Sequence, residues 1–120
     1  MSEDRLQSEI IKYLQLQYPK ARYCASMGGQ YQPYKSQQNR MKRTGYVKGF
    51  PDLQITEARD GYFGLFLEIK TIKGRATIEQ KRWIVDLLQR GYQAKIVKGL
   101  PQALDEIDKY MTKPETKRKQ

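Results

Sequence analysis

A chain of 120 residues has the length of one ordinary domain, and 38% apolar with 30% charged residues is a globular composition. Lysine and arginine total 23 against 13 acidic residues, so the net charge of +10 favours an anionic partner. Histidine is absent and Cys24 is the one cysteine, which excludes Ser-His-Asp and Cys-His catalysis, His-ligated metal sites and an internal disulfide. No apolar run approaches the roughly 18–20 residues of a membrane span, and the acidic N-terminus lacks a signal-peptide layout. We therefore expect an intracellular setting, cytoplasmic or nuclear, and chemistry based on carboxylates, lysine, glutamine, tyrosine and a hard metal ion.

The first part of the chain predicts a helix, a short strand and an irregular polar stretch. Apolar residues recur at three- and four-residue steps over residues 3–17, which predicts a helix. Residues 21–27 predict a strand that a Gly-Gly pair ends. Residues 30–48 show no convincing periodicity, which is typical of a functional or disordered segment.

The middle of the chain predicts a β-hairpin. Residues 52–56 and 62–70 read as strands, and the second is the strongest strand signal in the sequence. Asp60-Gly61 between them is typical of a two-residue hairpin turn. The two strands should therefore pair antiparallel.

The last part predicts helix, strand and helix. Residues 77–90 form a helix that opens with a capping box, Thr77-Ile-Glu-Gln, and ends before Gly91. Residues 92–97 predict a strand parallel to its predecessor, because a strand–helix–strand crossover links the two. A final helix follows over residues 100–111. This order predicts an α/β domain with a mixed sheet of about four strands flanked by helices, over residues 1–111, with a basic, flexible tail at 112–120.

Two carboxylates and a lysine meet in this arrangement. Glu68 and Lys70 point to the same side of the strand, because side chains alternate between its faces. Asp52 starts the preceding strand, and in an antiparallel hairpin that start lies beside the end of the partner. Two close carboxylates repel each other unless a cation lies between them, and Mg²⁺ accepts one or two carboxylates. The alternative is a surface ion pair between Glu68 and Lys70, with Asp52 as a turn residue.

These segments carry a resemblance to a known family. Gly49-Phe-Pro-Asp-Leu53, Glu68-Ile-Lys70, and Gln80 with Trp83 three residues on resemble the VRR-NUC (virus-type replication-repair nuclease) domain of the PD-(D/E)xK nuclease superfamily. The resemblance covers residues 3–111 and implies a restriction-endonuclease-like α-β-β-β-α-β core with a C-terminal helix. It implies a nuclease domain over residues 1–111, and a phage- or virus-encoded origin is compatible with it. It also implies Mg²⁺ or Mn²⁺ as cofactor, held by Asp52, Glu68 and the Ile69 backbone carbonyl, with Lys70 positioning the attacking water.

Two further site residues follow from the resemblance. Glu9 lies at the border of the apolar stripe of the first helix, where a family acid supports the metal or its waters; the alternative is an exposed acid paired with Lys12 or Arg5. Gln80 shares a helix face with apolar residues, and the family glutamine reaches the active site. The alternative for Gln80 is service in the capping box alone.

A basic stretch precedes Asp52. Residues 10–51 contain no aspartate or glutamate, and cations and tyrosines alternate along them, which suits phosphate binding and base stacking. The alternative is a solvated loop whose charge aids solubility. The predicted DNA-binding residues are Lys35, Arg40, Lys42, Arg43, Lys48, Lys73, Arg75, Lys81, Tyr31, Tyr34 and Tyr46.

The function expected from these features is a divalent-metal-dependent DNA endonuclease. Residues 83–88 carry more apolar surface than one sheet face needs, which indicates either core packing or a homodimer interface. Small family members resemble Holliday-junction resolvases, so we expect a homodimer that cuts branched DNA. The alternatives are a flap or nicking nuclease, defence-type cleavage of duplex DNA, and a non-catalytic DNA-binding module that retains the fold.

Overall fold

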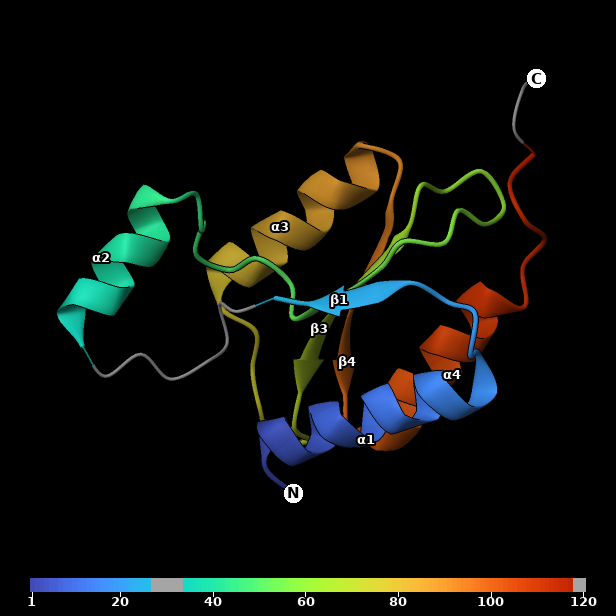
Figure 1. The fold of residues 1–120 in the computed structure, drawn as a ribbon, viewed down its shortest axis with the longest axis horizontal. Coiled ribbons are helices and arrows are strands. Elements are labelled where there is room, and N and C mark those ends of the chain that lie inside the picture. The colour runs from blue at the N-terminus through green and yellow to red at the C-terminus, as the bar shows by residue number, and fades with distance from the viewer. Residues whose placement is uncertain (27–33, 118–120) are drawn as a thin grey trace.

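The computed structural model describes residues 1–26 and 34–117, and Figure 1 shows its backbone. The chain forms, in order, α1 (Glu3–Gln17), β1 (Tyr23–Ala25), α2 (Lys35–Arg43), β2 (Leu53–Ile55), β3 (Leu65–Lys70), α3 (Ile78–Gln89), β4 (Gln93–Lys98) and α4 (Leu100–Met111). The predicted α/β class, with strands in one mixed sheet and a C-terminal helix, is confirmed.

The four strands lie in the order β1-β2-β3-β4. β2 pairs antiparallel with β1 and with β3, and β3 pairs parallel with β4, as the hairpin and crossover signals predict. Arg59 pairs with Tyr62 across the hairpin turn. Asp60 and Gly61 between them have φ angles of 49° and 85°, the left-handed conformation that such turns require.

Helices cover both faces of the sheet. α1 and α4 lie on one face, where their apolar residues pack against alternate residues of β3, including Leu67 and Ile69. α3 lies on the other face, where Ile84 and Leu87 pack against Phe66 and Ala94. Because side chains alternate along β3, the residue two positions after Phe66 also lies on the α3 face, and that residue is Glu68.

α2 corrects the expectation of an irregular stretch over residues 30–48. None of its residues is buried, and apart from Met41 it is entirely polar. Such a helix has no apolar stripe, so the sequence offers no 3.6-residue period to detect. Figure 1 shows α2 standing clear of the layers that enclose the sheet. Residues 30–33, and the end of the strand expected over 21–27, lie outside the described residues.

The part of the predicted tail that the structure describes contacts the hairpin. The Asp60 backbone N–H donates to the Pro114 carbonyl at 2.8 Å, and the Thr116 N–H donates to the Ala58 carbonyl at 3.1 Å. The end of the tail, residues 118–120, lies outside the described residues, and the domain boundary at residue 111 stays a prediction. Within the described ranges, no helix has the length and apolar character needed to cross a bilayer.

Candidate active site

Asp52 is fixed to the sheet at the start of β2. Leu53 pairs with Leu67, so extending the register by one residue places Asp52 opposite Glu68. The Ile69 backbone N–H donates to Asp52 Oδ2 at 2.8 Å. On the other side, the Ser26 N–H donates to the Asp52 carbonyl at 2.8 Å. Backbone contacts with both neighbouring strands therefore hold this carboxylate in place.

Glu68 is a buried acid with one carboxylate oxygen that lacks a hydrogen-bond partner among the described residues. It is 2% exposed, and in the described part of the chain its Oε1 atom has no hydrogen-bond partner. Burial raises the pKa of Glu68 well above its ordinary value, and a hydrogen bond with Asp52 and the Asp52 charge raise it further, while Lys70 opposes them. A buried carboxyl group with an unsatisfied oxygen next to a second carboxylate is a site that a cation would stabilise.

Lys70 completes the cluster. Its Nζ atom lies 3.7 Å from Glu68 Oε2 and 3.9 Å from Glu3 Oε1, and its side chain is 12% exposed. Glu3, in the first turn of α1, was not predicted for the site. An acid in the first turn also suits the positive end of the α1 dipole, and no pattern in the sequence links Glu3 to Lys70.

The donor set fits a hard divalent metal. The carboxylates of Asp52 and Glu68 and the backbone carbonyl of Ile69 are oxygen donors, which suit Mg²⁺ and Mn²⁺. No cluster of three or more His, Cys, Asp or Glu suited to a metal occurs in residues 1–26 and 34–117. A site with two acidic ligands matches Mg²⁺, which keeps several of its waters. The unsatisfied Oε1 of Glu68 is the structural observation that supports the fit.

Glu9 and Gln80 make contacts outside this cluster. Glu9 Oε1 lies 3.4 Å from Lys12 Nζ, which is the ion pair expected if Glu9 is an exposed acid of the helix. The Thr77 backbone N–H donates to Gln80 Oε1 at 2.8 Å, and the Gln80 N–H donates to Thr77 Oγ1 at 3.2 Å, so the capping box is complete. Roles for Glu9 and Gln80 at the metal stay predictions.

The predicted DNA-binding residues fall into three groups. Four cations lie on α2, and none of them forms an ion pair with another described residue: Lys35, Arg40, Lys42 and Arg43. Tyr34 caps α2 and is 66% exposed, whereas Tyr46 is half-buried and Tyr31 lies outside the described residues. The third group surrounds the start of α3: Lys48, Lys73, Arg75 and Lys81.

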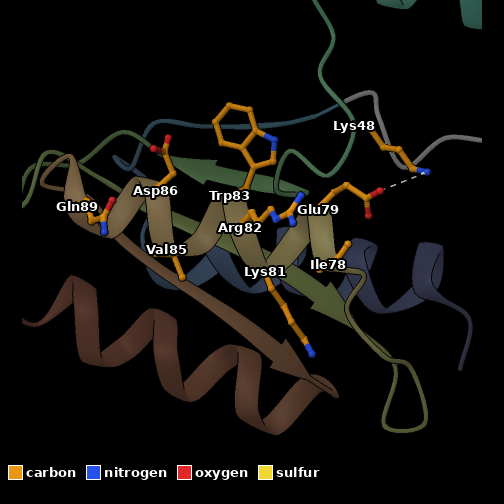
Figure 2. A pocket seen from close by; sticks show the side chains of 9 residues that line it. All are labelled: Lys48, Ile78, Glu79, Lys81, Arg82, Trp83, Val85, Asp86 and Gln89. Carbon is orange, nitrogen blue, oxygen red and sulfur yellow. Dashed lines mark ion pairs between the residues drawn. The ribbon is translucent and has the colours of Figure 1, made fainter.

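A groove runs along the outer side of α3. It has a volume of ≈ 640 Å³, and Figure 2 shows nine side chains that line it. Lys48 borders it and lies 3.8 Å from Glu79 Oε1. The side chains of Ile78 and Val85 are 60% and 54% exposed. Of the apolar residues predicted over 83–88, Ile84 and Leu87 are buried whereas Val85 and Leu88 are exposed, so the excess is partly core and partly surface.

In this α/β domain, a mixed sheet presents two acids and a lysine at the junction of two antiparallel strands. This arrangement resembles that of a PD-(D/E)xK nuclease site. The chain belongs to the VRR-NUC domain family, because the family model matches residues 1–101. A solved structure described as a VRR_NUC domain protein superimposes with a TM-score of 0.83 at 30% identity, covering 96% of this chain and 92% of that one. No curated protein matches the chain. Membership places the chain in a family of nucleases that act on DNA.

Proposed function

We propose that the chain is a divalent-metal-dependent DNA endonuclease that hydrolyses phosphodiester bonds. The observation that carries this proposal is the buried Glu68, with its unsatisfied Oε1 atom, beside the Asp52 carboxylate. Leaving one buried oxygen without a partner costs on the order of 1–3 kcal/mol, which a fold tolerates where function requires it. Asp52, Glu68 and the Ile69 carbonyl would hold the metal, which would supply Lewis-acid polarisation of the phosphate and a lower pKa for an attacking water.

Other residues of this chain would position the water, the ligands and the DNA. Lys70 Nζ lies beside Glu68 Oε2, so it can donate a hydrogen bond to the attacking water and oppose the negative charge that develops on the phosphate. Glu3 is 3.9 Å from the same Nζ and acts as a positioning residue. The backbone N–H of Ile69 keeps Asp52 aimed at the site. The cations of α2 bind the flanking phosphates.

We infer further that the preferred substrate is branched DNA, cut by a homodimer in the manner of a Holliday-junction resolvase. Support for the dimer comes from the exposed apolar positions Val85 and Leu88 on α3, which are 54% and 45% exposed. Two sites related by a dyad suit symmetric cuts across a four-way junction. Sedimentation of Val85→Lys tests the dimer, with Leu16→Lys as a matched control, because Leu16 is an exposed leucine of α1. A dimer that persists in Val85→Lys would contradict this interface.

Cleavage assays test the nuclease itself. Wild type, Asp52→Ala and Asp105→Ala are incubated with labelled four-way junction or linear duplex, in Mg²⁺, Mn²⁺ or EDTA. Asp105 is the control because it is an exposed acid of α4, paired with Lys109 at 3.0 Å. We expect metal-dependent junction cleavage by wild type and Asp105→Ala, and none by Asp52→Ala. Cleavage of duplex alone would remove the resolvase assignment, and binding without cleavage in every metal would leave a DNA-binding module.

A further inference from the structure

A second pocket lies next to the carboxylates. It has a volume of ≈ 270 Å³ and is lined by Ser26, Gly45, Tyr46, Val47, Phe50 and Trp83. These residues come from three places: the end of β1, the segment that links α2 to β2, and α3. Neither Asp52 nor Glu68 lines it, so it is distinct from the metal site. Three of its six lining residues are aromatic.

Backbone contacts and charge tie this pocket to the site. The Ser26 N–H donates to the Asp52 carbonyl at 2.8 Å, and Phe50 precedes Asp52 by two residues. Burial raises the pKa of Tyr46, a hydrogen bond with the Gly49 backbone opposes that, and the charges of Glu68 and Asp52 raise it further. Tyr46 therefore lies within electrostatic reach of both carboxylates, which agrees with the backbone contacts in placing the pocket near the proposed metal site.

The aromatic walls are fixed by core packing. The Phe50 ring lies edge-on to Trp83, with centroids 5.0 Å apart and planes at 86°. Phe50 also packs edge-on against Phe66 of β3, at 5.6 Å and 83°. Figure 2 shows Trp83 projecting from α3 away from Lys81. Because Phe66 belongs to the core, these contacts fix the orientation of Phe50 and Trp83 relative to the sheet.

The charge near the pocket indicates which class of ligand it binds. The segment that carries Tyr46 begins directly after α2, whose four cations suit a phosphate backbone. An aromatic pocket between a phosphate-binding helix and a phosphodiester-cutting site fits a nucleobase, because each base has a flat π-face that stacks on aromatic side chains. The base must be unpaired, since a base inside a duplex cannot leave its stack without being flipped out.

We propose that this pocket receives one unpaired nucleobase of the strand that is cut, next to the scissile phosphate. The inference rests on the proposed nuclease function and deepens it. It assigns recognition of unpaired nucleotides to Tyr46, Phe50 and Trp83, which gives a physical reason for a preference for branched over fully paired DNA. Base stacking on such walls is tolerant of sequence, so no particular base is favoured.

Trp83 supplies the probe, because it is the only tryptophan of the chain. The 120-residue chain is titrated in EDTA, where no cleavage is expected, with a duplex that carries a single-stranded overhang. The comparison DNAs are the same molecule with abasic sites throughout the overhang, and a blunt duplex. We expect quenching of Trp83 emission at saturation by the first DNA only. Equal quenching by the abasic or the blunt DNA would overturn the proposal.

Substitutions at Tyr46 give an independent readout. Tyr46→Leu removes the ring and is expected to weaken binding of the overhang DNA about 5- to 150-fold, with little change for the blunt duplex. Tyr46→Phe keeps the ring and should bind like wild type, as should Phe63→Leu, which removes an exposed aromatic ring outside the pocket. Unchanged overhang binding by Tyr46→Leu would overturn the proposal.

The two proposals fail separately. Both readouts measure binding in EDTA, so base-dependent quenching without cleavage in any metal would refute the nuclease and leave the pocket assignment. Metal-dependent cleavage without base-dependent quenching would refute the pocket assignment and leave the nuclease.

Discussion

Gly49 should be the glycine that this fold tolerates least well as alanine. Its φ is +92°, and a Cβ atom there would lie 2.7 Å from the Glu79 carbonyl carbon and 2.9 Å from the Gln80 nitrogen. The left-handed backbone costs a non-glycine residue about 1–2 kcal/mol, and overpacking against the α3 backbone adds about 1–3 kcal/mol. We therefore expect Gly49→Ala to lower the free energy of unfolding by about 2–5 kcal/mol.

Gly61→Ala is the matched control. Gly61 has a similar φ of +85°, but a Cβ atom there would meet nothing within 4 Å. This variant should lose only the backbone term, about 1–2 kcal/mol. Urea unfolding of both variants, with midpoints converted through a common m-value, measures the difference. Equal destabilisation would show that α3 yields freely and that its close approach to Gly49 is not a constraint.

The same substitution should affect cleavage beyond its effect on stability. Gly49 precedes Asp52 by three residues, and its contact with the start of α3 anchors the segment that leads into β2. Relief of the clash must move this segment and with it Asp52, and small displacements of a proposed metal ligand lower the reaction rate. We expect Gly49→Ala to lose at least tenfold in cleavage rate under conditions where it stays folded, whereas Gly61→Ala keeps the wild-type rate.

Three further predictions follow from other contacts. Burial, and next a hydrogen bond to Asp108, raise the pKa of Tyr18 above its ordinary value of 10.0. The contribution of Tyr18 to the free energy of unfolding is therefore complete below about pH 10 and is lost above it. Tyr18→Phe should lose less stability above pH 10 than wild type, and equal losses would contradict this. Replacing both Arg40 and Lys42 by alanine should reduce the slope of log K against log salt for duplex binding by about 1.8, and an unchanged slope would remove α2 from the interface. Gln80→Glu keeps the capping-box oxygen but loses the amide donor, so stability should change by less than about 0.5 kcal/mol while cleavage falls; unchanged cleavage would limit Gln80 to the cap.

The part of the candidate site that lies on the strands could be predicted from strand geometry. Alternation along β3 places Glu68 and Lys70 on one face, and hairpin pairing brings Asp52 beside them, so the proximity of these three residues follows from their spacing. The helices with apolar stripes could also be predicted, because each stripe packs into one of the two cores and therefore repeats along the sequence with the helical period.

Contacts between distant segments could not be predicted. The Glu3–Lys70 pair depends on how α1 crosses the end of β3, and no local pattern encodes that crossing. α2 was missed because a helix without an apolar face gives no periodic signal. β1, β2 and β3 are shorter than expected, since a strand ends where its partner stops pairing rather than where its propensity ends.

The location of Glu68 on β3 connects the proposed metal site to the proposed base pocket. Phe66 and Glu68 lie on the same face of the strand, and two strand residues span roughly 6–7 Å. Phe66 supports Phe50 and through it Trp83, while Glu68 faces Asp52. A shift of β3 along its axis would therefore move the aromatic pocket and the carboxylates together. Phe66→Leu should consequently impair metal-dependent cleavage and overhang binding in parallel, although Phe66 is not among the residues that line the pocket.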